Sequence, residues 1–151
     1  MKRNLIIEII SGLLILLFLY TGLSKLLEPE KFLFSLEKSP LLSPFSGFIS
    51  IALPAGEIIL AALLFFKRTQ LKGLWISLGL LSLFTAYLIY MVVFHDKLPC
   101  SCGGVISKMT WKQHIFFNLF FVLLTAIAIY THYKELKQKR ADNEGIGVVF
   151  T

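Results

Sequence analysis

The residues of this chain most able to do chemistry are its two cysteines, Cys100 and Cys102, which are followed by Gly103 and Gly104. A disulfide between them would close a small, strained ring, and strained or exposed disulfides tend to be the catalytic or labile ones. A bridge across so short a loop removes little entropy from the unfolded chain, so it would be a poor structural staple. The pair therefore indicates thiol–disulfide exchange first, with a static bridge as the alternative.

A metal site is the third interpretation of the same segment. His95 precedes Cys100 by five residues, and His114 follows at the start of an apolar block. Two thiolates and two imidazoles are a ligand set that zinc accepts in tetrahedral geometry. Cys-x-Cys is a less usual zinc spacing than Cys-x-x-Cys, however, and histidines at helix ends are the plainer interpretation.

Glu57 is the second residue of interest, because it interrupts an apolar block that begins near Phe45. It lies 12 residues into that block, or about 18 Å at ~1.5 Å per residue, close to the middle of a membrane. An ionisable group at that depth is a functional candidate when it faces other helices. Lys25 would be its partner only if the span began later, near Ile51; the expected partners are the hydroxyl groups of Tyr20, Ser24, Tyr87 and Tyr90. Glu57 is then either a polar clamp between helices or a catalytic or proton-relay group.

A stripe of polar residues runs along the last apolar block. His114, Asn118 and Thr125 are spaced so that they share one face of a helix, which should look inward. Such residues often only join helices by hydrogen bonds. They are also the donors that a quinone headgroup would need, and a quinone is the one organic cofactor that the sequence suggests.

Four apolar blocks must position these residues. Of the 151 residues, 56% are hydrophobic and 16% charged, against roughly 45–50% and about 25% in soluble domains. Each block has about the 20 residues that cross a hydrocarbon core, and none carries the charged stripe that a soluble helix needs. The sequence therefore predicts an all-α integral membrane four-helix bundle, one domain over residues 1–133, with spans at about 4–24, 45–66, 73–94 and 114–132.

The connections carry two further expectations. The first outer loop, 25–44, contains apolar residues that predict a short helix lying in the membrane interface. The tail, 134–151, should begin as a charged helical extension and become irregular over 141–151.

The charge distribution predicts an orientation. Nine Lys and Arg residues lie on the side of the termini and six on the other side. Because basic residues collect on the cytoplasmic side, both termini should be cytoplasmic and the cysteine loop periplasmic, in a bacterial inner (plasma) membrane. The net charge of +6 is therefore no sign of nucleic-acid binding, which is not expected. The expected partner is the lipid bilayer.

Three separated motifs resemble those of a known family. They are Gly22-x-x-Lys25-Leu26 at the end of the first block, Pro54-x-x-Glu57 in the second, and Cys100-x-Cys102-Gly103-Gly104 after the third. Their order and spacing resemble the DoxX-like membrane proteins, in particular the MauE (methylamine utilisation) branch, over roughly residues 5–133. The family usually has Phe where this chain has Gly103.

The resemblance implies a four-helix membrane protein associated with periplasmic redox chemistry, and MauE is tied to maturation of the disulfide-rich methylamine dehydrogenase. The residues that match the family pattern are Gly22, Lys25, Pro54, Glu57, Cys100, Cys102 and Gly104. The expected function is thiol–disulfide exchange with a thioredoxin-like or cysteine-rich exported protein. A non-catalytic accessory subunit of a redox complex and a metal-handling membrane protein are the alternatives.

Overall fold

The computed structural model describes residues 2–94 and 111–147, and side chains within 5–94 and 112–142. The described residues form helices and short turns, with no strand. The elements are α1 (Lys2–Leu27), α2 (Pro29–Glu37), the 3-10 turn η1 (Ser43–Phe45), α3 (Ser46–Phe65), α4 (Gln70–Phe94) and α5 (Trp111–Gly147). Four of them, α1, α3, α4 and α5, are long and apolar enough to cross a membrane. The predicted all-α four-helix architecture is confirmed.

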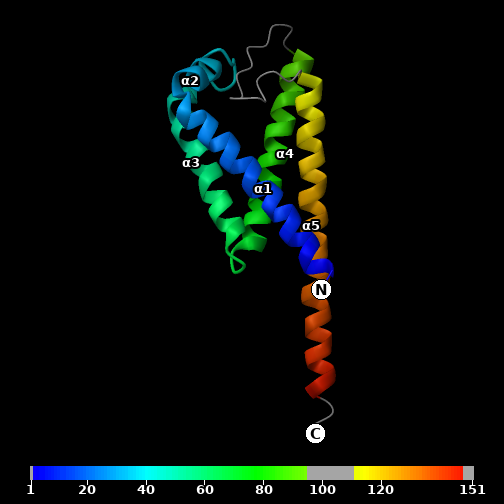
Figure 1. The fold of residues 1–151 in the computed structure, drawn as a ribbon. Coiled ribbons are helices and arrows are strands. Elements are labelled where there is room, and N and C mark those ends of the chain that lie inside the picture. Colours follow the sequence, from blue (N-terminus) through cyan, green and yellow to red (C-terminus); the bar gives the residue numbers. More distant parts are fainter. Residues whose placement is uncertain (1, 95–110, 148–151) are drawn as a thin grey trace.

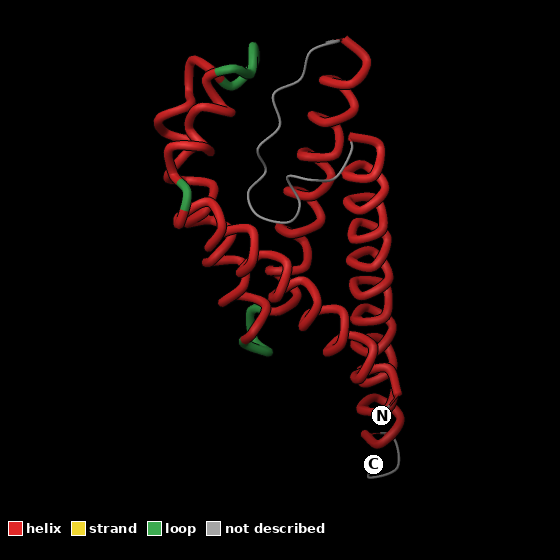
Figure 2. Tube along the Cα trace, turned by 45° about the horizontal axis from the view of Figure 1, so that its top comes forward, coloured by secondary structure: helices red, strands yellow, loops and turns green. Residues whose placement is uncertain are grey.

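The four long helices run alternately up and down (Figure 1). Helices α4 and α5 lie side by side, whereas α1 crosses diagonally and packs on both α5 and α3. The C-terminal end of α1, helix α2, the start of α3, the end of α4 and the start of α5 share one end of the molecule, which we call the α2 end. Toward that end α1 and α3 lean away from α4 and α5 (Figures 1 and 2).

The middle of the bundle is an apolar core to which every long helix contributes. Its buried members include Leu14, Phe18, Leu60, Leu64, Leu81 and Phe121. Large apolar side chains also point outward, among them Phe48 and Phe116, each 75% exposed. An outer surface so rich in large apolar side chains fits hydrocarbon as its solvent.

Helix α2 confirms the short helix that was predicted in the first outer loop, and its place relative to the membrane interface stays a prediction. Pro29 occupies its first turn, where the missing N–H leaves no helical bond unmade. The side chains of Phe32 and Leu36 are buried toward the bundle. Just beyond the helix, the hydroxyl groups of Ser39 and Tyr87 hydrogen-bond at 2.6 Å, which ties this segment to α4.

Helix α5 is longer than expected. It extends to Gly147, so the prediction that the chain is irregular from Ala141 onward is wrong for residues 141–147. Residues 134–141 are Lys, Glu, Leu, Gln, Arg and Ala, all of which favour helix and let an established helix continue. At about 1.5 Å per residue, the 37 residues span about 55 Å, and α5 projects beyond the bundle (Figure 1).

Candidate functional site

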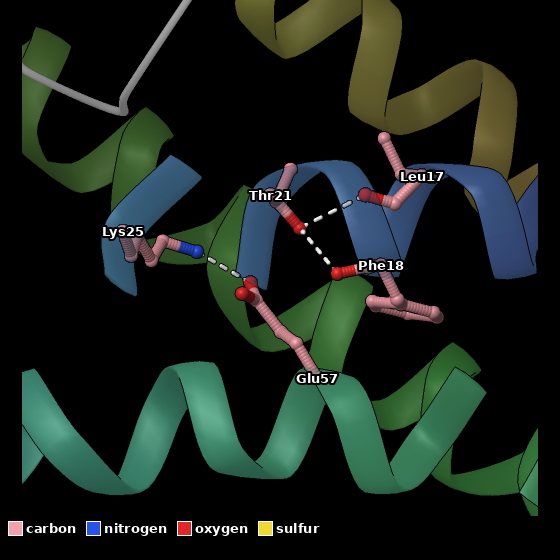
Figure 3. Close-up of polar contacts among 5 residues, drawn as sticks. All are labelled: Leu17, Phe18, Thr21, Lys25 and Glu57. Carbon is pink, nitrogen blue, oxygen red and sulfur yellow. Dashed lines mark hydrogen bonds and ion pairs between the residues drawn. The ribbon is translucent and has the colours of Figure 1, made fainter. Parts of the chain in front are cut away.

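The central feature of the described structure is a buried ion pair between Lys25 of α1 and Glu57 of α3 (Figure 3). Lys25 Nζ donates to Glu57 Oε1 at 2.5 Å. The two side chains are only 9% and 8% exposed. Glu57 therefore faces other helices, which is the condition for treating it as a functional candidate.

The pair exists because α1 and α3 approach each other closely at Gly22. A Cβ atom built on Gly22 would lie 3.3 Å from the backbone oxygen of Pro54 and 3.4 Å from Glu57 Cβ. Even an alanine would require its neighbours on α3 to give way by a few tenths of an ångström, whereas glycine lets the two backbones approach closely. Lys25 lies one turn further along α1, so the Gly22-x-x-Lys25 and Pro54-x-x-Glu57 motifs meet as two halves of one contact.

The partner of Glu57 differs from the expected one. Lys25 was expected to reach Glu57 only if the second span began near Ile51, yet α3 begins at Ser46. Two features explain the difference: α1 continues to Leu27 instead of ending near Ser24, and its diagonal course lays its last turns against the middle of α3. In the structure Glu57 Oε1 accepts from Lys25.

The surroundings of the pair were not anticipated. Lys25 Nζ lies 5.5 Å from the ring centroid of Phe32, so the ammonium also contacts α2 by a cation–π interaction. Thr21, one turn before Lys25, lies beside the Glu57 carboxylate, and its hydroxyl donates to the carbonyl of Leu17 at 3.0 Å (Figure 3). Thr21 shares a helix face with Lys25, and that spacing was the signal in the sequence that could have identified it.

The polar stripe of α5 faces inward, as predicted. His114, Asn118 and Thr125 are 6%, 4% and 0% exposed. The His114 ring lies 5.8 Å from the ring of Phe84 on α4. His114 lies near the start of α5, at the α2 end, and the ion pair lies between that end and the apolar core.

The remaining predicted site residues, Cys100, Cys102, Gly104 and His95, lie outside the described residues. Within the described ranges no three His, Cys, Asp or Glu side chains are grouped as a metal site would require. Of the four ligands in the metal interpretation, only His114 is described, so that interpretation stays a prediction.

The comparison with protein families bears on all of these residues together. The family model described as methylamine utilisation protein MauE matches residues 3–131, which is most of the chain. The chain belongs to the MauE family. The match includes both halves of the Lys25–Glu57 contact and the segment with the two cysteines, and it confirms the resemblance seen in the sequence. Neither the curated proteins nor the solved structures gave a match.

MauE-family membership and the four apolar helices together make this chain a multi-pass membrane protein. In this setting the ion pair is a strong constraint, because a lone charge in hydrocarbon is costly. Lys25 and Glu57 neutralise each other, and each therefore depends on the other to stay buried. Chemically, such a pair is able to clamp two helices and to exchange a proton between its members.

Removing one member of this buried pair should lower the free energy of unfolding far more than removing one member of a pair at the surface. We expect Lys25→Met or Glu57→Gln to lower the free energy of unfolding by about 3–5 kcal/mol, because each leaves one buried charge without its partner. The double variant Lys25→Met/Glu57→Gln should lose less than the two single losses combined. Unfolding of the purified protein by SDS in mixed micelles measures all three.

The matched control is the Glu28–Lys31 pair, whose side chains are 47% and 68% exposed. Lys31→Met should change the free energy of unfolding by about 0–1 kcal/mol. Equal losses at the buried and the exposed pair would show that Lys25 and Glu57 do not clamp α1 to α3.

Proposed function

We propose that this membrane protein carries out thiol–disulfide exchange through Cys100 and Cys102, at the surface of the membrane where the α2 end of the bundle emerges. The observation that carries the proposal is the position of the cysteine segment in the chain. These are the only two cysteines of the sequence, and they lie in the connection between α4 and α5.

Chain length limits where the two thiols can act. Cys100 follows Phe94, the last residue of α4, by six residues, and covalent geometry keeps it within about 20 Å of that helix end. The opposite end of α4, at Gln70, is 24 residues away, or about 36 Å along the helix. The thiols therefore serve one membrane surface, the one nearer to Lys25, Glu57 and His114.

The exchange itself balances in a simple way. A dithiol of an exported protein reduces the Cys100–Cys102 disulfide; two electrons and two protons pass to this chain, and the partner gains its own disulfide. A thioredoxin-like protein, or a cysteine-rich protein under maturation, is the class of partner that supplies such a dithiol. The reduced pair must then be reoxidised, and a quinone in the lipid phase is the acceptor that takes up the same two electrons and two protons.

The described helices support this role by holding the α2 end together. Lys25 contacts Glu57 of α3 and Phe32 of α2, and Ser39 joins Tyr87 of α4. These contacts link α1, α2, α3 and α4. Helix α5 is joined to α4 by the contact between the rings of His114 and Phe84. An exchange-active pair needs such a fixed platform, because a partner must reach the same sulfur in each cycle.

Trapping tests the exchange directly. With Cys102 changed to Ser, the Cys100 thiolate attacks the disulfide of the oxidised partner, in the reverse direction of the exchange, and releases one partner thiol. Cys100 then has no neighbour to resolve the mixed disulfide, so covalent adducts with an exported protein should accumulate and appear on non-reducing gels. Cys100→Ser gives the reciprocal variant, and the double Cys100→Ser/Cys102→Ser protein is the matched control that forms no adduct.

Two results would contradict the proposal and favour the alternatives. Absence of adducts, together with a Cys100–Cys102 bridge that resists reductant, would make the protein a static accessory subunit. Stoichiometric zinc or copper in the purified protein, lost in the double cysteine variant, would make it a metal-handling protein.

The orientation has its own test. We expect a membrane-impermeant maleimide, applied to reduced intact cells with a permeable outer membrane, to label Cys100 and Cys102, because basic residues favour the cytoplasm for the termini and the α3–α4 turn. The matched control is Arg68→Cys in a protein without its native cysteines, which should be labelled only after lysis. The reverse pattern would place the cysteines in the cytoplasm.

A further inference from the structure

Helix α5 continues past the end of the bundle that lies opposite the α2 end (Figure 1). The contact between the rings of Phe84 and His114 sets the register of α4 against the antiparallel α5. Thr69, in the α3–α4 turn, lies 15 residues before Phe84, and Ile129 lies the same number of residues after His114. At about 1.5 Å per residue in both helices, the turn and Ile129 stand at about the same depth, and the part of α5 after Ile129 projects from the bundle.

The projecting part of α5 has one face that is aromatic and basic. Tyr130, Tyr133, Lys137 and Arg140 stand at i, i+3, i+7 and i+10, and Lys134 adds a third cation beside them. We call these five residues the basic face. The side chains of Tyr130 and Tyr133 are 69% and 54% exposed, and the three cations are exposed as well.

The opposite side of the same segment carries Glu135, Lys139 and Asp142, at i, i+4 and i+7. Its formal charge is −1, whereas that of the basic face is +3. Among the side chains that the structure describes, no carboxylate forms an ion pair with a cation of the basic face, although Lys31 and Lys67 elsewhere each have such a partner. A helix that only needs solvation mixes both signs around its surface, so this separation favours an anionic partner on one side.

The depth of the basic face indicates which anion it meets. Tyrosine is typical of the membrane interface, where the ring contacts acyl chains and the hydroxyl meets the headgroups. Lys134 and Lys137 lie about 6 and 10 Å beyond Tyr130, and the headgroup layer extends several Å from the hydrocarbon. Long basic side chains also reach back toward that layer. The anion present at this depth in a bilayer is the phosphodiester of a phospholipid.

The neighbouring elements add to the positive charge at this depth. The α3–α4 turn and the first turn of α4 expose Arg68 and Lys72. The segment 28–38 around α2, by contrast, carries three glutamates and two lysines. Cations close to the membrane surface attract anionic lipids, so the attraction belongs to the end with the basic face.

We propose that the basic face of α5 binds the phosphate groups of anionic phospholipids at the end of the bundle opposite the α2 end. Lys134, Lys137 and Arg140 pair with phosphodiester oxygens, and the rings of Tyr130 and Tyr133 pack against the lipid below the headgroups. This binding requires no cysteine, so it stands or fails independently of the thiol exchange proposed above.

Two charge reversals separate binding by this face from attraction by net charge alone. Lys137→Glu removes a cation from the basic face, and Lys139→Glu makes the same change of charge on the opposite side of the helix. The full chain is reconstituted with equal amounts of phosphatidylglycerol and phosphatidylcholine, and the lipids that stay bound after extraction in mild detergent are counted.

We expect bound phosphatidylglycerol to exceed phosphatidylcholine about threefold in the original protein and in Lys139→Glu, and the two lipids to be about equal in Lys137→Glu. Equal amounts of the two lipids in the original protein would overturn the proposal. So would an equal loss of phosphatidylglycerol in the two variants, because the net charge would then suffice.

A reporter locates the bound lipid on α5. Tyr133→Trp is made in a chain whose own Trp75 and Trp111 are changed to Phe, and brominated lipids quench a tryptophan that they contact. Brominated phosphatidylglycerol should quench the reporter about twice as strongly as brominated phosphatidylcholine, and Lys137→Glu should remove the difference. Equal quenching by the two lipids would contradict binding at this face. The lipid count uses the original chain, so it decides alone if the reporter protein does not fold.

Inorganic phosphate distinguishes a lipid from a soluble anion. Replacing chloride by phosphate at equal ionic strength should leave the bound phosphatidylglycerol unchanged, because the lipid phosphate is held in the bilayer next to the basic face. Loss of the lipid in phosphate buffer would assign the basic face to a soluble anion and overturn the proposal.

Discussion

A lone charge in the apolar interior of a membrane protein is expensive, and the architecture of this chain follows from how it meets that constraint. Lys25 and Glu57 neutralise each other at 2.5 Å, far from the ends of α3. The pair fixes where α1 crosses α3, because Gly22 allows the close approach and the length of the lysine side chain spans what remains. Breaking the pair would leave an unpaired charge buried in an apolar interior. The crossing of these helices is therefore set by electrostatics as much as by packing.

The pair also divides the bundle into two halves of different character. Toward the termini the interior is largely apolar, with Leu14, Leu64 and Leu74 each at most 1% exposed. Toward the α2 end it holds the ion pair, His114 and Asn118, and the connection with the two cysteines starts and finishes there. The ion pair and His114 therefore lie on the same side of the apolar core as the connection that carries the only two cysteines of the sequence.

Much of this was predictable from the sequence, and the failures have specific physical causes. The number of long helices followed from apolar blocks of membrane-spanning length, and the inward face of α5 followed from the spacing of His114, Asn118 and Thr125. Lys25 was not expected as the partner of Glu57, because the depth of Glu57 in the membrane was counted along its own helix alone. The tilt of α1, which brings Lys25 level with Glu57, arises from tertiary packing and leaves no mark in local periodicity. The MauE-family motifs contained the answer, since Gly22-x-x-Lys25 and Pro54-x-x-Glu57 have equal spacing and meet in space.

The central claim is that the attraction between residues 25 and 57, whichever charge each carries, holds α1 against α3. Exchanging the charges tests it most directly, by measuring the yield of folded, membrane-inserted protein for Lys25→Glu, Glu57→Lys and the double swap. The single reversals place like charges together in a buried site and should give almost no folded protein, whereas the double swap should recover a substantial part of the original yield. Single reversals that fold normally, or a double swap no better than either single, would contradict the claim.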